Sequence, residues 1–160
     1  MKHIISLLLL LVGYVVAEGN SSGTHNISFA TTEGTWMSVD MSPNGKTIAF
    51  DLLGHIYLLP ISGGKARAIT NGTSWNMFPR FSPDGNTILF TSDRSGSDDL
   101  WTQDLSSGEM KNISGMKFPV HQGTWSNDSR HVFGTALNMK VRHPVYMFNM
   151  YGEKQEIVPA

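Results

Sequence analysis

The sequence MSPNGKTIAF at residues 41–50 returns as FSPDGNTILF at residues 81–90, and a degraded copy, WSNDSRHVFG, follows at residues 125–134. The copies start 40 and 44 residues apart. Self-similarity at a fixed period of this size indicates a repeat architecture, so the fold follows from the structure of one repeat unit.

The repeat unit has the composition of short strands joined by tight turns. In the motif SPDG at residues 82–85, proline suits position i+1 of a type I turn and glycine suits position i+3. The flanking runs are short, rich in Ile, Phe, Tyr, Trp and Thr, and bounded by Gly and Asn, which is typical of hairpin strands. Four such strands in about 40 residues predict one blade of a β-propeller.

Three units of this kind follow one another along the chain. We place them at residues of about 33–70, 76–114 and 121–158, with extra length between the second and third strands at 92–99 and 135–144. The predicted fold class is all-β, with about three blades of four antiparallel strands. Because propellers close with 4–8 blades, three blades form an incomplete propeller. Either the chain is a fragment of a longer protein, or several copies assemble into a ring.

The N-terminal residues have the pattern of a signal peptide. A short positive start precedes the apolar run at residues 4–16, and small residues place a cleavage site after Ala17, with Gly19 as a second possibility. A run of about a dozen apolar residues is too short to cross ~30 Å of hydrocarbon, so an uncleaved anchor is the weaker alternative. We therefore predict a signal peptide at 1–17 and export to the periplasm or the medium. A linker and leading strand follow at 18–32, and its residues 27–32 are expected to complete a last blade that the sequence lacks.

Composition excludes several classes of function. The net charge is −1, and the 12 basic residues are scattered, whereas a nucleic-acid surface needs clustered Lys and Arg. Cysteine is absent, which excludes disulfides, thiolate nucleophiles and cysteine zinc sites.

The same motifs resemble a known family. Residues 33–40 (EGTWMSVD) and 50–57 (FDLLGHIY) are similar to the start of TolB-like propellers that precede amidohydrolase domains. Residues 79–101 resemble the repeat shared more widely by TolB, tricorn-type proteases and prolyl-oligopeptidase-like enzymes. The repeat is specific for the fold and weak for the function. In the amidohydrolase fusions the catalytic metal site begins with a His-x-His pair, which this sequence lacks, so the resemblance assigns no catalytic residue here.

Local motifs for catalysis or metal binding are weak. The pattern G-x-S-x-G occurs at residues 19–23, but in a polar linker without the strand and helix that a serine nucleophile requires. No two histidines are spaced i,i+2 or i,i+4, and His55 is expected in an exposed turn. The six are His3, His25, His55, His121, His131 and His143. We therefore predict no catalytic residue, no cofactor and no metal in this chain.

The loop at residues 93–99 (DRSGSDD) is faintly similar to a calcium loop but lacks the closing Glu. The preferred interpretation is a hairpin loop in which Asp side chains cap amides and Arg94 balances their charge. Calcium binding is the alternative.

Aromatic residues recur at one blade position. Tyr57, Trp101 and Tyr146 are equivalent, which favours packing between blades over ligand binding. Trp75 lies between two units and is the better surface candidate. Five Asn-x-Ser/Thr sequons, which matter only in a host that glycosylates, occur at Asn20, Asn26, Asn71, Asn112 and Asn127.

These observations lead to a functional expectation. The chain is a non-catalytic exported propeller module, expected to be the N-terminal part of a larger amidohydrolase-type enzyme in which it acts as a scaffold or gates access. The alternatives are a TolB-like module that binds a protein in the envelope, and the gating propeller of an exported peptidase. The expected partners are missing blades, a C-terminal catalytic domain, an envelope protein or a second copy of the chain. We expect no nucleic-acid partner, and we expect contact with the membrane only through the signal peptide.

Overall fold

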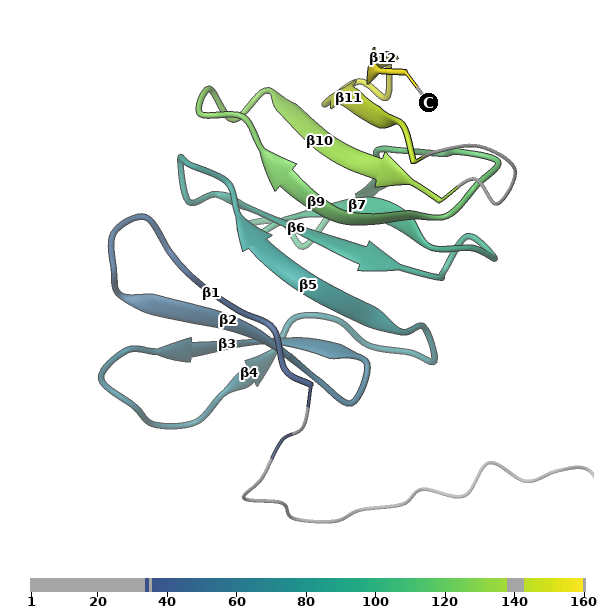
Figure 1. The fold of residues 1–160 in the computed structure, drawn as a ribbon. Helices are drawn as coiled ribbons and strands as arrows, with labels where there is room; N and C mark the ends of the chain where they lie inside the picture. Colours follow the sequence, from purple (N-terminus) through teal and green to yellow (C-terminus); the bar gives the residue numbers. More distant parts are fainter. Residues whose placement is uncertain (1–33, 35, 138–142, 160) are drawn as a thin grey trace, which may run out of the picture. The chain divides into compact units, whose positions relative to one another are not determined.

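The computed structural model describes residue 34, residues 36–137 and residues 143–159. These residues form three antiparallel sheets of four strands, each a meander in chain order (Figure 1). This confirms the predicted all-β blades. The first blade comprises β1 (Val39–Met41), β2 (Thr47–Leu52), β3 (His55–Pro60) and β4 (Arg67–Ala68). The second blade comprises β5 (Asn76–Phe81), β6 (Thr87–Ser92), β7 (Asp99–Asp104) and β8 (Met110–Asn112). The third blade comprises β9 (Val120–Trp125), β10 (His131–Ala136), β11 (Val145–Asn149) and β12 (Lys154–Val158).

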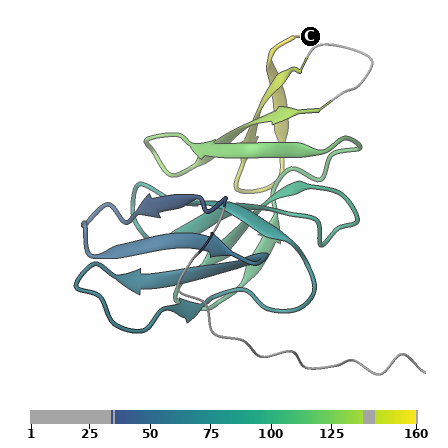
Figure 2. The same cartoon turned by 60° about the horizontal axis from the view of Figure 1, so that its bottom comes forward.

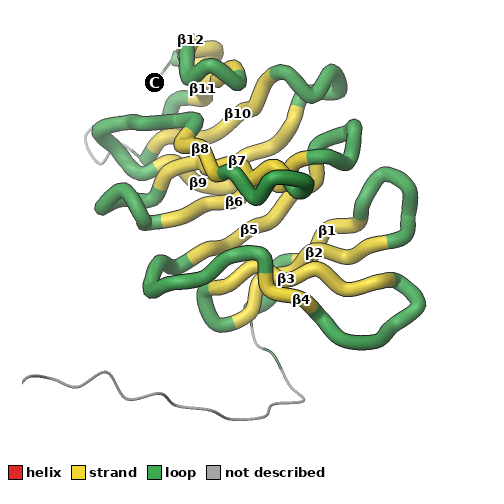
Figure 3. Tube along the Cα trace, turned by 180° about the vertical axis from the view of Figure 1, so that it is seen from behind, coloured by secondary structure: helices red, strands yellow, loops and turns green. Residues whose placement is uncertain are grey.

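Figure 3 shows the described part of the chain as strands and loops, without a helix. Accordingly, no helix in this part is long and apolar enough to cross a membrane. The predicted signal peptide at 1–17, including its apolar stretch at 4–16, and the linker and leading strand at 18–32 lie outside the described residues.

The predicted turns after the first strands are confirmed. The N–H of Gly45 donates to the carbonyl of Ser42, and that of Gly85 donates to Ser82, both at 2.8 Å. Each serine hydroxyl also closes its turn from within, because it donates to the Asx residue two positions on and accepts the N–H five positions on. For Ser82 these partners are Asp84 at 2.5 Å and Thr87 at 3.0 Å.

The third blade keeps this turn although it has neither the proline nor the glycine. Ser129 adopts φ 58°, the left-handed conformation that Gly45 and Gly85 adopt in the other turns. The bond from its N–H to the carbonyl of Ser126 lengthens to 3.2 Å, while Ser126 still donates to Asp128 and accepts from His131. The hydrogen bonds from Ser126 and from the Arg130 amide lower the pKa of Asp128 to about 2.

The blades pack face to face, with the second blade in the middle (Figures 1 and 2). One apolar cluster joins the first and second blades and a second joins the second and third. The first contains Ala49, Ile56, Phe81, Ile88 and Phe90, and the second contains Leu89, Leu100, Ile113, Val120, Val132, Ala136 and Phe148. Strand alternation places neighbouring residues such as Ile88 and Leu89 on opposite faces of the second blade, so this blade contributes to both clusters.

The directions of the strands place the connections between them at two opposite ends of the blades. The first strands lie beside one another, because β5 contacts both β1 and β9. Successive strands run in opposite directions, so the turns at 42–45, 82–85 and 126–129 share one end, here called the turn end. The connections between second and third strands and the linkers between blades share the opposite end, here called the loop end.

Candidate functional site

The loop end exposes an aromatic residue ahead of the first strand of every blade. Trp36, Trp75 and Phe118 are 99, 52 and 42% exposed. Single exposed apolar residues are ordinary, but here three large aromatic residues recur at one end of three blades. Trp75 was the surface candidate of the sequence analysis.

Trp75 is held in place on two sides. Its backbone N–H donates to the Asp93 carboxylate at 2.8 Å. Its indole lies against Gly54, where an added Cβ would stand 3.1 Å from the Trp75 Cε3 atom. Gly54 has φ +77°, and the preceding Leu53 has φ 50° and is also exposed. The result is a fixed apolar surface of Leu53 and Trp75 at the junction of the first two blades.

A buried side chain fixes the backbone behind this surface. The Asn76 side-chain amide donates to the carbonyls of Gly54 at 2.7 Å and Ser74 at 2.8 Å. Its oxygen accepts a bond of 2.7 Å from the Arg94 guanidinium. Asn76 is fully buried, and all these groups are paired, so its role is to join the two blades.

Arg94 does not balance the loop carboxylates as we expected. Its guanidinium points inward, bonding Ser92 and Asn76 and lying 5.0 Å from the Trp101 ring centroid. Among the described residues it forms no ion pair with a carboxylate. Burial lowers the pKa of Arg94, and the charge of nearby Asp93 opposes that shift. A planar cation that can stack on aromatic rings finds its best partners in the blade interior.

The carboxylate of Asp99 is occupied by hydrogen bonds from other groups of the chain. It accepts hydroxyl bonds of 2.6 Å from both Ser95 and Ser114, a side-chain bond from Asn112, and the N–H of Met116. Burial raises the pKa of Asp99, but these hydrogen bonds outweigh burial and lower it. The carboxylates of the loop at 93–99 therefore cap backbone N–H groups as predicted, but those of Trp75 and Met116, which lie outside the loop. Within the described residues no three acidic or histidine side chains gather in a way that could hold a metal.

The described histidines lie apart. His55 begins β3 and is half-buried, so the prediction of an exposed turn was wrong; Leu53 and Gly54 make the turn instead. His121 and His131 each approach one aspartate at 3.4 Å, Asp98 and Asp128 respectively. His3 and His25, and the G-x-S-x-G pattern at 19–23, lie outside the described residues.

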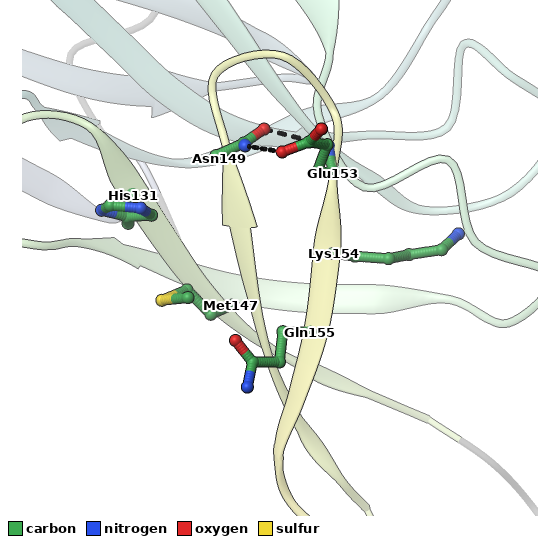
Figure 4. Close-up of a pocket in the computed structure, with 6 residues that line it drawn as sticks. All are labelled: His131, Met147, Asn149, Glu153, Lys154 and Gln155. Carbon is green, nitrogen blue, oxygen red and sulfur yellow. Dashed lines mark hydrogen bonds between the residues drawn. The ribbon is translucent and has the colours of Figure 1, made fainter.

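A hollow of about 340 Å³ opens on the third blade (Figure 4). Asn149 and Glu153 close a hairpin there, because the Asn149 amide donates to the Glu153 carboxylate at 2.6 Å and the Glu153 N–H donates back at 2.9 Å. These groups serve the turn and present no nucleophile beside a base. The hollow is lined by His131, Met147, Asn149, Glu153, Lys154 and Gln155.

The recurring aromatics pack as predicted where a neighbouring blade exists. Trp101 packs against the first cluster and Tyr146 against the second. Tyr57 stacks on Phe50, with ring centroids 5.4 Å apart, on a face of the first blade that no described blade covers. Of the sequons, Asn71 and Asn127 are exposed, whereas the Asn112 amide bonds Asp99; Asn20 and Asn26 lie outside the described residues.

The chain matches the PD40 family, described as the TolB beta propeller domain, over residues 16–158. It belongs to the TolB β-propeller family. This TolB-type propeller is 40% identical to the Tol-Pal system protein TolB of Bordetella pertussis over 58 residues, which cover 36% of the chain and 13% of that protein. It is 26% identical to dipeptidyl-peptidase 5 of Porphyromonas gingivalis over 118 residues, 69% of the chain and 16% of the peptidase. The solved TolB of Acinetobacter baumannii superimposes with a TM-score of 0.66 at 25% identity, covering 80% of this chain and 33% of that one.

The TolB-type propeller thus spans a third or less of each relative named here. These relatives are TolB proteins and peptidases, so they do not support the amidohydrolase fusion that residues 33–57 led us to expect.

One structural residue of the TolB-type propeller escaped the sequence analysis. Asp51 is buried in β2, and its carboxylate accepts the N–H of Ser38 at 2.9 Å and that of Phe78, in the next blade, at 2.8 Å. Phe78 sits at a β-bulge with φ 57°. The available signal was a carboxylate between Phe50 and Leu52 on a mainly apolar strand, because a buried charge requires hydrogen-bond partners.

Proposed function

We propose that this chain is part of an exported, non-catalytic propeller module that binds a protein partner through its loop end. The observation that carries the proposal is Trp75, half-exposed yet fixed by Asp93 and Gly54. A large aromatic side chain that is already ordered loses little entropy on binding, and such residues dominate the energy of protein interfaces. Membership of the TolB propeller family supports this interpretation over an enzyme activity residing in these blades.

Export is part of the proposal. Its support is the apolar stretch at residues 4–16, followed by small residues at the cleavage site after Ala17.

A second candidate is a propeller that gates access to the active site of an exported peptidase. The similarity to dipeptidyl-peptidase 5 favours it. In that case the loop end would contact a catalytic domain or a peptide substrate rather than a separate envelope protein. The amidohydrolase scaffold ranks below both, because it rests on the resemblance of residues 33–57 alone.

Site-specific photo-crosslinking in the producing organism tests the proposal. A photoreactive phenylalanine analogue at position 75 should give one discrete protein adduct, identified by mass spectrometry. The same analogue at Asn44, in a turn at the opposite end, should not. With the identified partner, Trp75→Ala should weaken binding more than tenfold, as expected for an interface hot spot, and Asn44→Ala should leave it unchanged. Adducts with peptides alone would favour the peptidase interpretation, and equal adducts from both positions would refute a loop-end site.

A further inference from the structure

Asparagine is followed by glycine twice in the sequence, at Asn44–Gly45 and at Asn71–Gly72. In such a pair the backbone nitrogen of the glycine can attack the side-chain carbonyl carbon of the asparagine, because glycine has no side chain to hinder the approach. The attack closes a succinimide ring, and the side-chain nitrogen leaves as ammonia with the proton of the glycine N–H. Water then opens the ring at either carbonyl. The products are aspartate and isoaspartate, and in isoaspartate the backbone runs through Cγ.

Hydrogen bonds hold both reacting groups of the first pair. Asn44 lies in the turn at 42–45, where the N–H of Gly45 donates to the carbonyl of Ser42 at 2.8 Å. The nitrogen that would attack is therefore already engaged. The Asn44 side-chain oxygen accepts the Ser42 hydroxyl at 2.8 Å and the Lys46 N–H at 3.0 Å, which fixes the side-chain amide as well. This pair can react only after its turn opens.

The second pair lies in the linker that runs from β4 to β5, between two anchored positions (Figure 1). Before it, Thr70 is buried, and its hydroxyl accepts the N–H of Ile56 at 2.9 Å. After it, the N–H of Trp75 donates to Asp93 at 2.8 Å. These bonds fix the two ends of the linker and leave residues 71–73 between them.

The structure shows little that restrains the second pair itself. Asn71, Gly72 and Thr73 are all exposed. Among the residues that the structure describes, none forms a hydrogen bond with the Asn71 side chain or the Gly72 N–H. Gly72 also has open space around it, since an added Cβ would meet no atom within 4 Å. The attack at Asn71 therefore needs only rotation within an exposed bend and breaks none of the hydrogen bonds described above.

We propose that Asn71 is a deamidation site, which converts to aspartate and isoaspartate in the native fold while Asn44 remains intact. The conversion adds one negative charge to the linker that carries Trp75, and the isoaspartate product also lengthens the backbone of that linker by one carbon. The inference does not depend on the proposed function, because the reaction needs only the linker and water.

Ageing the purified chain in mildly alkaline buffer tests the proposal. Water enriched in heavy oxygen marks each residue that deamidates during the incubation, and mass spectrometry of tryptic peptides then locates the label. Asn71 should react at least about tenfold faster than Asn44, because the reaction at Asn44 must first break three hydrogen bonds. The same chain unfolded in urea is the matched control. There both pairs should react at similar rates, since each is Asn followed by Gly.

Three variants extend the test. Ser42→Ala removes the hydroxyl that holds the Asn44 amide, so Asn44 should react faster while the rate at Asn71 stays unchanged. Asn71→Gln should abolish labelling at position 71, because attack on the longer side chain closes a larger ring less readily. Asn71→Asp, which reproduces the aspartate product, should unfold at the same urea concentration as the unsubstituted chain.

Several outcomes would overturn the proposal. Equal rates at the two pairs in the native chain would mean that the turn does not protect Asn44. An Asn71 that reacts in urea but not in the native chain would mean that the fold restrains the linker, and an earlier urea midpoint for Asn71→Asp would mean the same. A difference in rate that persists in urea would assign the selectivity to the local sequence and not to the fold.

Discussion

Replacing Asp51 by alanine should cost the fold roughly 3 kcal/mol. The carboxylate satisfies two partly buried backbone N–H groups, those of Ser38 and Phe78, and leaving each unpaired costs up to ~1–3 kcal/mol. Part of this loss in unfolding free energy is offset by relief of backbone strain. The left-handed backbone at Phe78 stores of order 1–3 kcal/mol of strain, which can relax once the carboxylate is gone. The stability of Asp51→Asn should lie between that of the unsubstituted chain and that of Asp51→Ala. The amide keeps one acceptor oxygen but turns its NH₂ donor toward the other backbone N–H.

The second blade supplies a matched control for this experiment. Thr91 occupies the position of Asp51 forty residues on, is fully buried, and its hydroxyl has no hydrogen-bond partner among the described residues. Thr91→Val should therefore be neutral or stabilising. Equilibrium urea unfolding followed by tryptophan fluorescence measures both variants at one protein concentration. A loss below about 1 kcal/mol for Asp51→Ala, or an equal loss for Thr91→Val, would refute the assigned role.

Three further predictions concern packing, acid stability and chemistry. Gly134→Ala should destabilise the chain by about 1–3 kcal/mol in urea unfolding, because the new Cβ would lie 2.7 Å from Leu100 Cδ1 and 2.8 Å from Val120 Cγ1. In a Leu100→Ala background, which removes one of these two contacts, the added cost should be smaller. Hydrogen bonds from Ser106 and Ser107 lower the pKa of Asp104 to about 2. The resulting stabilisation should be complete above pH 4 and lost as the pH falls through 2, and an NMR titration of Ser106→Ala should move the Asp104 midpoint upward. The isolated chain should hydrolyse no ester or peptide substrate with or without added zinc. Turnover that one His or Asp substitution abolishes would contradict this and show that the blades contain a catalytic site.

The repeat predicted the fold because its signals are local. The SPDG motif at residues 82–85 specifies a turn within four residues, and the alternating apolar residues on either side specify the strands that it joins. The prediction that Trp101 packs between blades held for the same reason, since equivalent positions in a stacked repeat meet equivalent surroundings.

The candidate site was harder to predict because it depends on partners distant in sequence. Arg94 sits among three aspartates in the chain, yet its guanidinium finds Asn76, 18 residues away, and the ring of Trp101. Asp51 reaches Phe78 across 27 residues. Neither pairing follows from local composition, because the stacking of the blades decides which side chains meet. The exposure of Trp75 was predictable from its place in a linker, but its fixation by Gly54 was not.

The turn of the third blade has a consequence for recognising propellers in other sequences. Residues 126–129 lack both Pro and Gly, yet the Ser126 hydroxyl still donates to Asp128 and accepts the N–H of His131. The Ser82 hydroxyl makes the same two hydrogen bonds, to Asp84 and from Thr87. The hydroxyl and the carboxylate are thus sufficient to define the corner. A search for degenerate blades should therefore weight a serine followed two residues later by Asp or Asn, and treat the proline and glycine as optional. Such a pattern would find units that the SPDG signature overlooks.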